Sequence, residues 1–149
     1  MILPKELGVY LNIVHFKFKQ AFYEYFLNEG LQITPEQYIV LDTLWDKGAM
    51  SQQKLADIMQ KDKNSVTKLV DILEKKNLLT RKSDKNDRRV KILEVTELAA
   101  SLKEKTTVVA LNAVNDLLKN IHEDDLKKVI EVLRKINANI DDIHYGTII

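Results

Sequence analysis

Few residues in this chain can interrupt a helix. Only four glycines and two prolines occur among its 149 residues, and these two residue types disfavour a helix interior most strongly. Long helices are therefore expected. From Leu7 to about Asn28, apolar residues recur with i, i+4 and i+7 spacing, which predicts the first helix. Other apolar residues lie off that stripe, so this helix is expected to pack against more than one surface.

The next three helices are predicted from their N-terminal caps. Thr34, with proline following it and Gln37 three residues later, predicts a helix from residue 35 to residues 47–48. Ser51 and Asp62 are suited to cap two further helices, which residues 60–61 separate. The apolar residues of these two helices recur at helical spacing and are Leu55, Ile58, Met59, Val66, Leu69, Val70 and Leu73.

The pattern changes near residue 79. Segments 79–82 and 90–95 are rich in β-branched residues and are bounded by turn formers, so we expect two short strands joined in a hairpin. Thr96 is expected to cap a long helix from Glu97 to about Lys119, and His122 a last helix with an acidic first turn. The apolar stripe of that last helix is Leu126, Val129, Ile130, Leu133, Ile136 and Ile140.

This order of elements predicts the fold. Helix, short helix, turn, helix and two strands form a winged helix-turn-helix, which we expect over residues 33–96. Long helices at residues 5–30 and 97–145 flank it and are expected to form a helical dimerisation region. The predicted fold class is therefore mainly α, an α+β winged helix, in a single domain of residues 1–149.

The net charge of +1 hides an asymmetry. Residues 51–93 contain twelve Lys or Arg against six Asp or Glu, a net charge of +6. The rest of the chain has eleven basic and sixteen acidic residues, a net charge of −5. A basic segment in an acidic remainder indicates a localised face for a polyanion. Chance clustering on a solvated surface is the alternative.

The helix after Asp62 has the amphipathic pattern of a helix that enters the DNA major groove. At about 100° per residue, its buried stripe lies opposite a polar side, and readout comes mainly from the N-terminal turns of such a helix. We therefore expect base or phosphate contacts from Asn64, Ser65, Thr67 and Lys68. Asp71 would repel phosphates, and we expect it to pair with Lys75 at i+4. A plain amphipathic surface helix is the alternative.

The hairpin tip SDKNDRRVKI, residues 83–92, is charged in a way that suits DNA. An arginine there can enter the narrow, electronegative minor groove, and the carboxylate of Asp87 can orient the guanidinium of Arg89. Phosphate contacts, which position a module without reading sequence, are expected from Arg81, Lys82, Arg88 and Lys91. A solvated turn in which Asp87 and Arg89 merely pair is the alternative.

These residues resemble the MarR family of winged-helix transcriptional regulators. The matching segments are ITPEQYIVLDTLW, SQQKLADIMQKDKNSVTKLVDILEKKNLL and SDKNDRR, the last followed by Val95-Thr96. The resemblance implies a homodimer built from the first and last helices, bound to double-stranded DNA at a pseudo-palindromic operator, with Arg89 in the minor groove. The returning strand departs from the family pattern, with Lys91 where an apolar residue is usual and Ile92 where a polar one is.

The expected site residues form two groups. The DNA-binding residues are Ser51, Gln52, Lys63, Asn64, Ser65, Thr67, Lys68, Arg81, Lys82, Asp87, Arg88 and Arg89. The resemblance also suggests a cleft for a small aromatic or amphipathic effector, which His15, Tyr38 and Trp45 could line. Each of these three residues could equally be ordinary core.

Other classes of protein and site are not expected. The chain has no cysteine, and His15, His122 and His144 lie far apart without metal-binding spacing, so no metal site is predicted. No phosphate-binding glycine loop, activated nucleophile or cofactor fingerprint occurs, so neither an enzyme nor a cofactor is expected. No apolar run approaches the roughly 18 residues of a membrane span, and no secretory signal is visible, which favours the cytoplasm.

The sequence thus predicts a homodimeric DNA-binding regulator, most simply a repressor that a small molecule releases. A winged-helix module that binds proteins and never touches DNA is the alternative. The basic excess and the arginine-bearing hairpin favour the regulator.

Overall fold

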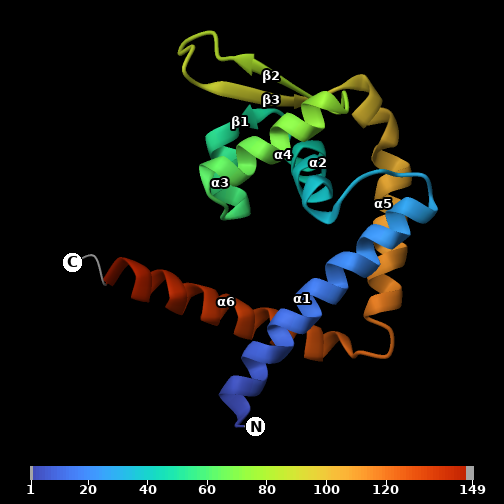
Figure 1. Ribbon diagram of the computed structural model, residues 1–149, viewed down its shortest axis with the longest axis vertical. Helices are drawn as coiled ribbons and strands as arrows, with labels where there is room; N and C mark the ends of the chain where they lie inside the picture. The colour runs from blue at the N-terminus through green and yellow to red at the C-terminus, as the bar shows by residue number, and fades with distance from the viewer. Residues whose placement is uncertain (1, 147–149) are drawn as a thin grey trace. The chain divides into compact units, whose positions relative to one another are not determined.

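A computed structural model describes residues 2–146 of the chain and the side chains of residues 2–143 (Figure 1). The side chain of His144 lies outside this range. The chain divides into two compact units, Met1–Val114 and Asn115–Ile149, and each is described by itself. Among the described residues, no helix has both the length and the apolarity needed to cross a membrane.

The observed elements follow the predicted order. They are α1 (Leu3–Asn28), α2 (Pro35–Lys47), β1 (Met50–Ser51), α3 (Gln52–Met59), α4 (Lys63–Lys75), β2 (Leu79–Ser83), β3 (Lys91–Val95), α5 (Glu97–Leu117) and α6 (Glu123–Gly146). Each strand of the hairpin differs from prediction by one residue at the hairpin tip, and two helix bounds also differ. Helix α1 begins four residues early, because Pro4 is well tolerated in a first helical turn. Helix α5 ends before Lys119, and Asn120 beyond it adopts a positive φ of 63°.

All the predicted helix caps are confirmed. In each, a side-chain atom of the capping residue accepts a hydrogen bond from a backbone N–H two or three residues later, at 2.6 to 3.2 Å. At Thr34 the arrangement is reciprocal, because the side chain of Gln37 also accepts from the Thr34 N–H. These caps satisfy backbone donors that the first turn of a helix leaves unpaired. The capping residues are Thr34, Ser51, Asp62, Thr96 and His122.

The three strands form one antiparallel sheet in the order β1-β3-β2. Strand β1 was not predicted, because two residues are too few to show an alternating pattern. In it Met50 pairs with Leu93 and Ser51 with Ile92. The strand therefore attaches the start of α3 to the hairpin.

The returning strand β3 accommodates its unusual lysine at one end. Lys91 and Leu93 are two residues apart and therefore lie on the same face of the strand. Leu93 is fully buried. Lys91 lies at the tip end of the hairpin, where it is exposed and its Nζ donates to the Ser83 hydroxyl at 2.9 Å. The departure at Lys91 therefore leaves the facing of β3 intact.

The core of the winged helix is formed by α2, α3, α4 and the sheet. Its fully buried side chains come from every one of these elements, so each amphipathic helix is held by tertiary packing. They are Val40, Leu41, Leu55, Val66, Val70, Leu73, Leu79 and Leu93. At one edge the Lys76 ammonium donates to the Gln32 carbonyl at 2.6 Å and to Gln37 Oε1 at 2.9 Å, which ties the end of α4 to the capping box of α2.

Helix α1 contacts the winged helix through its C-terminal half. Phe22 and Phe26 are buried there, and Lys19 forms an ion pair with Glu36 of α2. The N-terminal half remains apolar and exposed, with Tyr10 at 57% and Phe16 at 62% exposure. An apolar surface of this kind on a helix indicates a further partner.

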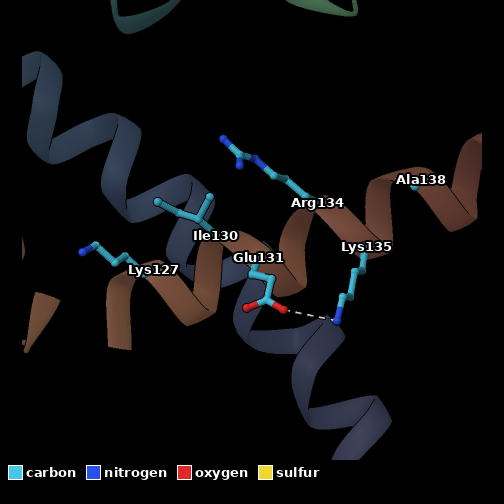
Figure 2. Close-up of a pocket in the computed structure, with 6 residues that line it drawn as sticks. All are labelled: Lys127, Ile130, Glu131, Arg134, Lys135 and Ala138. Carbon is cyan, nitrogen blue, oxygen red and sulfur yellow. Dashed lines mark ion pairs between the residues drawn. The ribbon is translucent and has the colours of Figure 1, made fainter. Parts of the chain in front are cut away.

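In the second unit, α6 carries the predicted apolar stripe, and most of this stripe is exposed. Val129, Ile130 and Leu133 are between 41% and 53% exposed. A groove of about 580 Å³ lies on this helix, and Figure 2 shows the side chains that line it. Its lining mixes basic and apolar side chains, and Lys135 pairs with Glu131 beside it at 3.3 Å. The lining residues are Lys127, Ile130, Glu131, Arg134, Lys135 and Ala138.

Candidate nucleic-acid interface

Helix α4 presents its polar side to solvent, as predicted. Its apolar residues Val66, Val70 and Leu73 are buried, while Asn64 and Lys68 are exposed. Lys63 is also exposed, and Ser65 and Thr67 are half-buried on the flanks. The N-terminal turns of α4 therefore carry exposed donors and a positive charge, which a major-groove helix requires.

The flanking Thr67 links α4 to α3. Its hydroxyl donates to the Lys63 carbonyl at 2.8 Å and accepts from Nε2 of Gln52 at 3.0 Å. The Thr67 hydroxyl is thus already engaged, whereas the amide oxygen of Gln52 is not used in this pair. Gln52 is therefore better suited than Thr67 to present a polar group to a base. Ser51, the other predicted residue before α3, is half-buried and occupied as the helix cap.

The predicted pairing of Asp87 with Arg89 is confirmed. The Arg89 backbone N–H and Nε donate to Asp87 Oδ1 at 3.0 and 3.1 Å, and Nη2 donates to Oδ2 at 3.3 Å. These hydrogen bonds from Arg89 lower the pKa of the Asp87 carboxyl below its ordinary value. The Arg89 side chain nevertheless remains 91% exposed. An oriented guanidinium therefore projects from the tip of the hairpin.

Arg81, which was predicted to contact phosphates, forms an ion pair within the protein. Its Nη2 donates to Asp71 Oδ1 at 2.6 Å, and the side chain is only 21% exposed. The predicted pairing of Asp71 with Lys75 is therefore wrong. The i+4 spacing offers only a weak exposed pair, whereas β2 brings a guanidinium directly beside α4. Lys82 of the same strand is exposed, as is Arg88 at the tip.

A set of exposed basic residues thus occupies two adjoining elements. They lie around the N-terminal half of α4 and on the β2–β3 hairpin, which packs beside α4 (Figure 1). The sequence-level excess of positive charge is therefore concentrated on a surface and not dispersed. The members are Lys61, Lys63, Lys68, Lys82, Lys85, Arg88, Arg89 and Lys91.

The three residues suggested for an effector cleft have different environments. The Tyr38 ring lies 5.9 Å from the Phe22 ring and 5.4 Å from the Phe26 ring, and burial raises the pKa of its phenol, with a further contribution from Asp42. Trp45 is half-buried, and its Nε1 is buried with no hydrogen-bond partner among the described residues. His15 is exposed on α1, about two turns before Phe22.

Sequence reasoning missed the two phenylalanines that contact Tyr38. Phe22 and Phe26 are spaced i, i+4 on α1 and face the same side, so a shared contact was foreseeable, but their partner on α2 was not. Within the part of the chain that the structure describes, no cluster of three side chains could hold a metal ion.

Comparison with known proteins finds transcriptional regulators that are similar to this chain. The model of the MarR family matches residues 33–91. The chain is 28% identical over 112 residues, 75% of its length, to the transcriptional regulator MhqR of Bacillus subtilis, of which the match covers 77%. It is 33% identical over 79 residues, 53% of its length, to the organic hydroperoxide resistance transcriptional regulator of the same bacterium, of which 54% is covered.

Solved structures share the fold over most of the chain. A mutant of E. coli MarR in complex with operator DNA matches with a TM-score of 0.80 and 24% identity, over 91% of this chain and 99% of that one. BpsR of Bordetella bronchiseptica matches with a TM-score of 0.81 and 20% identity, over 92% and 96% of the two chains. The element order, the capped α4, the Asp87–Arg89 hairpin and these likenesses agree: the chain has the winged helix-turn-helix fold, and its residues 33–91 match the model of the MarR family.

Proposed function

We propose that this protein is a sequence-specific DNA-binding transcriptional regulator. The observation that carries the proposal is the pairing of two exposed DNA-reading features in one basic region. One is the polar side of α4, and the other is the Arg89 guanidinium that Asp87 orients at 3.0 to 3.3 Å. Similarity to the MarR family model and to the transcriptional regulator MhqR supports this reading.

Each element has a distinct role in this proposal. The exposed N-terminal turns of α4 enter the major groove, where Asn64 and Lys68 meet base edges or phosphates. The hairpin enters the neighbouring minor groove with Arg89, whose side chain is free enough to reach it. Lys82 and Arg88 contact phosphates. The other residues of the proposed DNA-binding region are Ser51, Gln52, Lys63, Ser65, Thr67, Asp87 and Arg81, the last of which pairs with Asp71.

The active form is a homodimer in this proposal, bound to a pseudo-palindromic operator. The exposed apolar residues of α1 and α6 support it, because a chain of this size seldom leaves so many large apolar side chains in water. Residues 5–30 and 97–145 form the dimerisation region, and residues 1–149 function as one MarR-type domain. Two-fold symmetry in the protein would then match two half-sites in the DNA.

A small aromatic or amphipathic effector is proposed to release the DNA, so that the protein acts as a repressor in the cytoplasm. The BpsR structure concerns regulation of that protein's DNA binding by 6-hydroxynicotinic acid. In this chain the buried indole N–H of Trp45 is unpaired among the described residues. Such a donor favours a ligand with a hydrogen-bond acceptor, and Tyr38 and His15 are the other candidate contacts.

Binding of the protein to labelled duplexes from the DNA upstream of its own gene tests the proposal. If the two winged domains neutralise on the order of 6 to 10 phosphates, log K falls against log salt with a slope of about −0.9 per phosphate. Random duplexes of equal length are the control for sequence specificity. A slope near zero, or no binding at low salt, would identify a module that recognises something other than DNA.

A further inference from the structure

An ion pair connects the recognition helix to the hairpin. Asp71 belongs to α4 and Arg81 to β2, and Nη2 of Arg81 donates to Oδ1 of Asp71 at 2.6 Å. The Arg81 side chain is 21% exposed and that of Asp71 is 48% exposed. A short, partly buried pair of this kind is less screened by salt than a surface pair.

The partly buried position of Arg81 has a cost. Its Nε is buried and has no hydrogen-bond partner within residues 2–143, and an unsatisfied donor destabilises a fold. Strand β2 is held in place here, because Leu79 is buried in the core and Arg81 itself pairs with Leu93 of β3. Asp71 is therefore the partner that compensates the guanidinium.

Asp71 and Arg81 both lie close to the residues proposed to contact DNA. Asp71 lies three residues after Lys68, so its carboxylate is about one helical turn from the proposed DNA contacts. Arg81 lies two residues before Ser83, where the strand leaves the core and runs toward the tip that bears Arg89. The pair therefore joins the element proposed for the major groove to the element proposed for the minor groove.

We propose that Asp71 and Arg81 are positioning residues that hold the hairpin against α4, so that the helix and Arg89 meet DNA with a fixed spacing. The inference rests on the proposed function and gives Arg81 a different task from phosphate contact. It also explains a carboxylate beside a DNA-binding surface, because the negative charge of Asp71 is neutralised by the guanidinium it holds. Pre-organisation of this kind reduces the ordering that binding would otherwise require.

Removal of the Asp71 charge distinguishes phosphate contact by Arg81 from a positioning role, because the two roles predict opposite changes in operator affinity. If Arg81 contacts phosphates and Asp71 merely competes for it, Asp71→Asn frees a cation and takes away a repelling charge. Operator binding then becomes tighter, and the salt slope becomes steeper by about 0.9. If the pair positions the hairpin, Asp71→Asn weakens operator binding by about three- to tenfold despite the loss of negative charge, as coupled contacts of this size do.

The experiment measures operator affinity and salt slope for Asp71→Asn and Arg81→Gln, each with and without Arg89→Ala, well below the melting temperature of every variant. We expect Arg81→Gln to weaken binding without a change in slope, whereas the neighbouring Lys82→Gln, the matched control, lowers the slope by about 0.9. We also expect Arg89→Ala to cost less operator affinity in the Asp71→Asn background than in the wild type. On a logarithmic scale, the fold-change in affinity should be at most half as large. A pair that only stabilises the fold would leave that loss unchanged.

The outcomes remain distinct if one part fails. Tighter binding by Asp71→Asn, or an unchanged penalty for Arg89→Ala, would overturn the positioning role while leaving DNA binding intact. Absence of DNA binding by the wild-type protein would instead overturn the proposed function. Should Asp71→Asn fold poorly, Asp71→Glu keeps the charge but changes its reach, and the positioning role then requires a loss of affinity where phosphate contact requires none.

Discussion

At the scale of single residues, the hairpin tip combines two properties that rarely occur together. The Arg89 side chain is almost fully exposed, yet three hydrogen bonds to Asp87 restrict where its guanidinium points. A free arginine loses considerable rotamer freedom when it binds. Because Asp87 already limits that freedom, the Arg89 guanidinium is prepared for a narrow groove before DNA arrives.

Replacement of Arg89 by alanine is expected to weaken operator binding by about 1–3 kcal/mol, because it removes the minor-groove contact. The melting temperature should barely change, since the side chain is exposed and packs against little. Asp87→Ala should weaken binding less than Arg89→Ala does, and Arg88→Ala should weaken all DNA sequences about equally. Anisotropy titrations with operator and random duplexes check the series. Wild-type affinity in Arg89→Ala would show that the hairpin is only a solvated turn.

The cap of α4 gives a prediction about pH. Hydrogen bonds from the backbone N–H and then the side chain of Ser65 lower the pKa of Asp62 below its ordinary value of 3.8. A carboxyl group with a lowered pKa in the folded state stabilises the fold above its unfolded pKa and loses that effect as pH falls through the folded value. We therefore expect the ionised cap to stabilise the protein at neutral pH and to stop doing so in acid below about pH 4.

Melting curves of wild type and Asp62→Asn between pH 7 and pH 3 measure this effect. Asn keeps an acceptor for the cap but cannot ionise, so it is the matched control for charge. The difference in melting temperature should narrow as pH falls below about 4. A difference that stays constant across that range would mean that the charge of Asp62 contributes nothing to the cap.

At the scale of elements, α4 and the hairpin are two proposed DNA-contacting elements that are held by the same core. Helix α4 is held by its buried stripe and by Gln52 of α3, which bonds to Thr67. The hairpin is held by pairing of β3 with both β1 and β2. The Asp71–Arg81 pair then fixes the spacing between the two elements. Because neither element has to move to meet DNA, the contacts of α4 should not depend on whether the hairpin makes its contacts.

Losses from Lys68→Ala and Arg89→Ala are therefore expected to add. The two side chains share no partner and lie on different elements, and independent sites add within about 0.5 kcal/mol. Operator affinities of the two single variants and the double variant test this, with the Asp71→Asn background as the contrast. A double variant no weaker than either single variant would mean that helix and hairpin do not bind DNA at the same time.

At the scale of the whole molecule, exposed apolar side chains are the main unexplained feature of the isolated chain. They lie on the N-terminal half of α1 and along α6, where Leu133 is 41% and Ile140 58% exposed. Burial of apolar area stabilises association by about 25 cal/mol per Å² before association costs are subtracted. A second copy of the chain would bury such surfaces in a symmetric way.

Light scattering at micromolar concentration should therefore give twice the 17.2 kDa chain mass. Leu133→Glu places a charge on the apolar stripe and should shift the mass toward one chain, while operator affinity falls because one protomer binds only one half-site. Lys128→Glu, on the polar side of the same helix, is the control and should remain dimeric. A wild-type mass near 17.2 kDa would contradict the dimer.

The sequence by itself determined the features that depend on residues close together in the chain. Caps at Thr34, Ser51 and Asp62 were readable because each acts on an N–H three residues later. The polar side of α4 followed from helical spacing, and the Asp87–Arg89 pair from a separation of two residues. The family resemblance also lay within one continuous stretch, residues 33–97, which the family model matches over residues 33–91.

Tertiary structure decided whatever depends on distant residues brought together. Strand β1 exists only because β3 passes beside Met50, some forty residues away in sequence. Tyr38 meets Phe22 and Phe26 only because α1 and α2 pack. Asp71 prefers Arg81 to Lys75 for the same reason: sheet pairing fixes the guanidinium beside α4 in a partly buried position, whereas a pair along the exposed helix must restrict two flexible side chains in water.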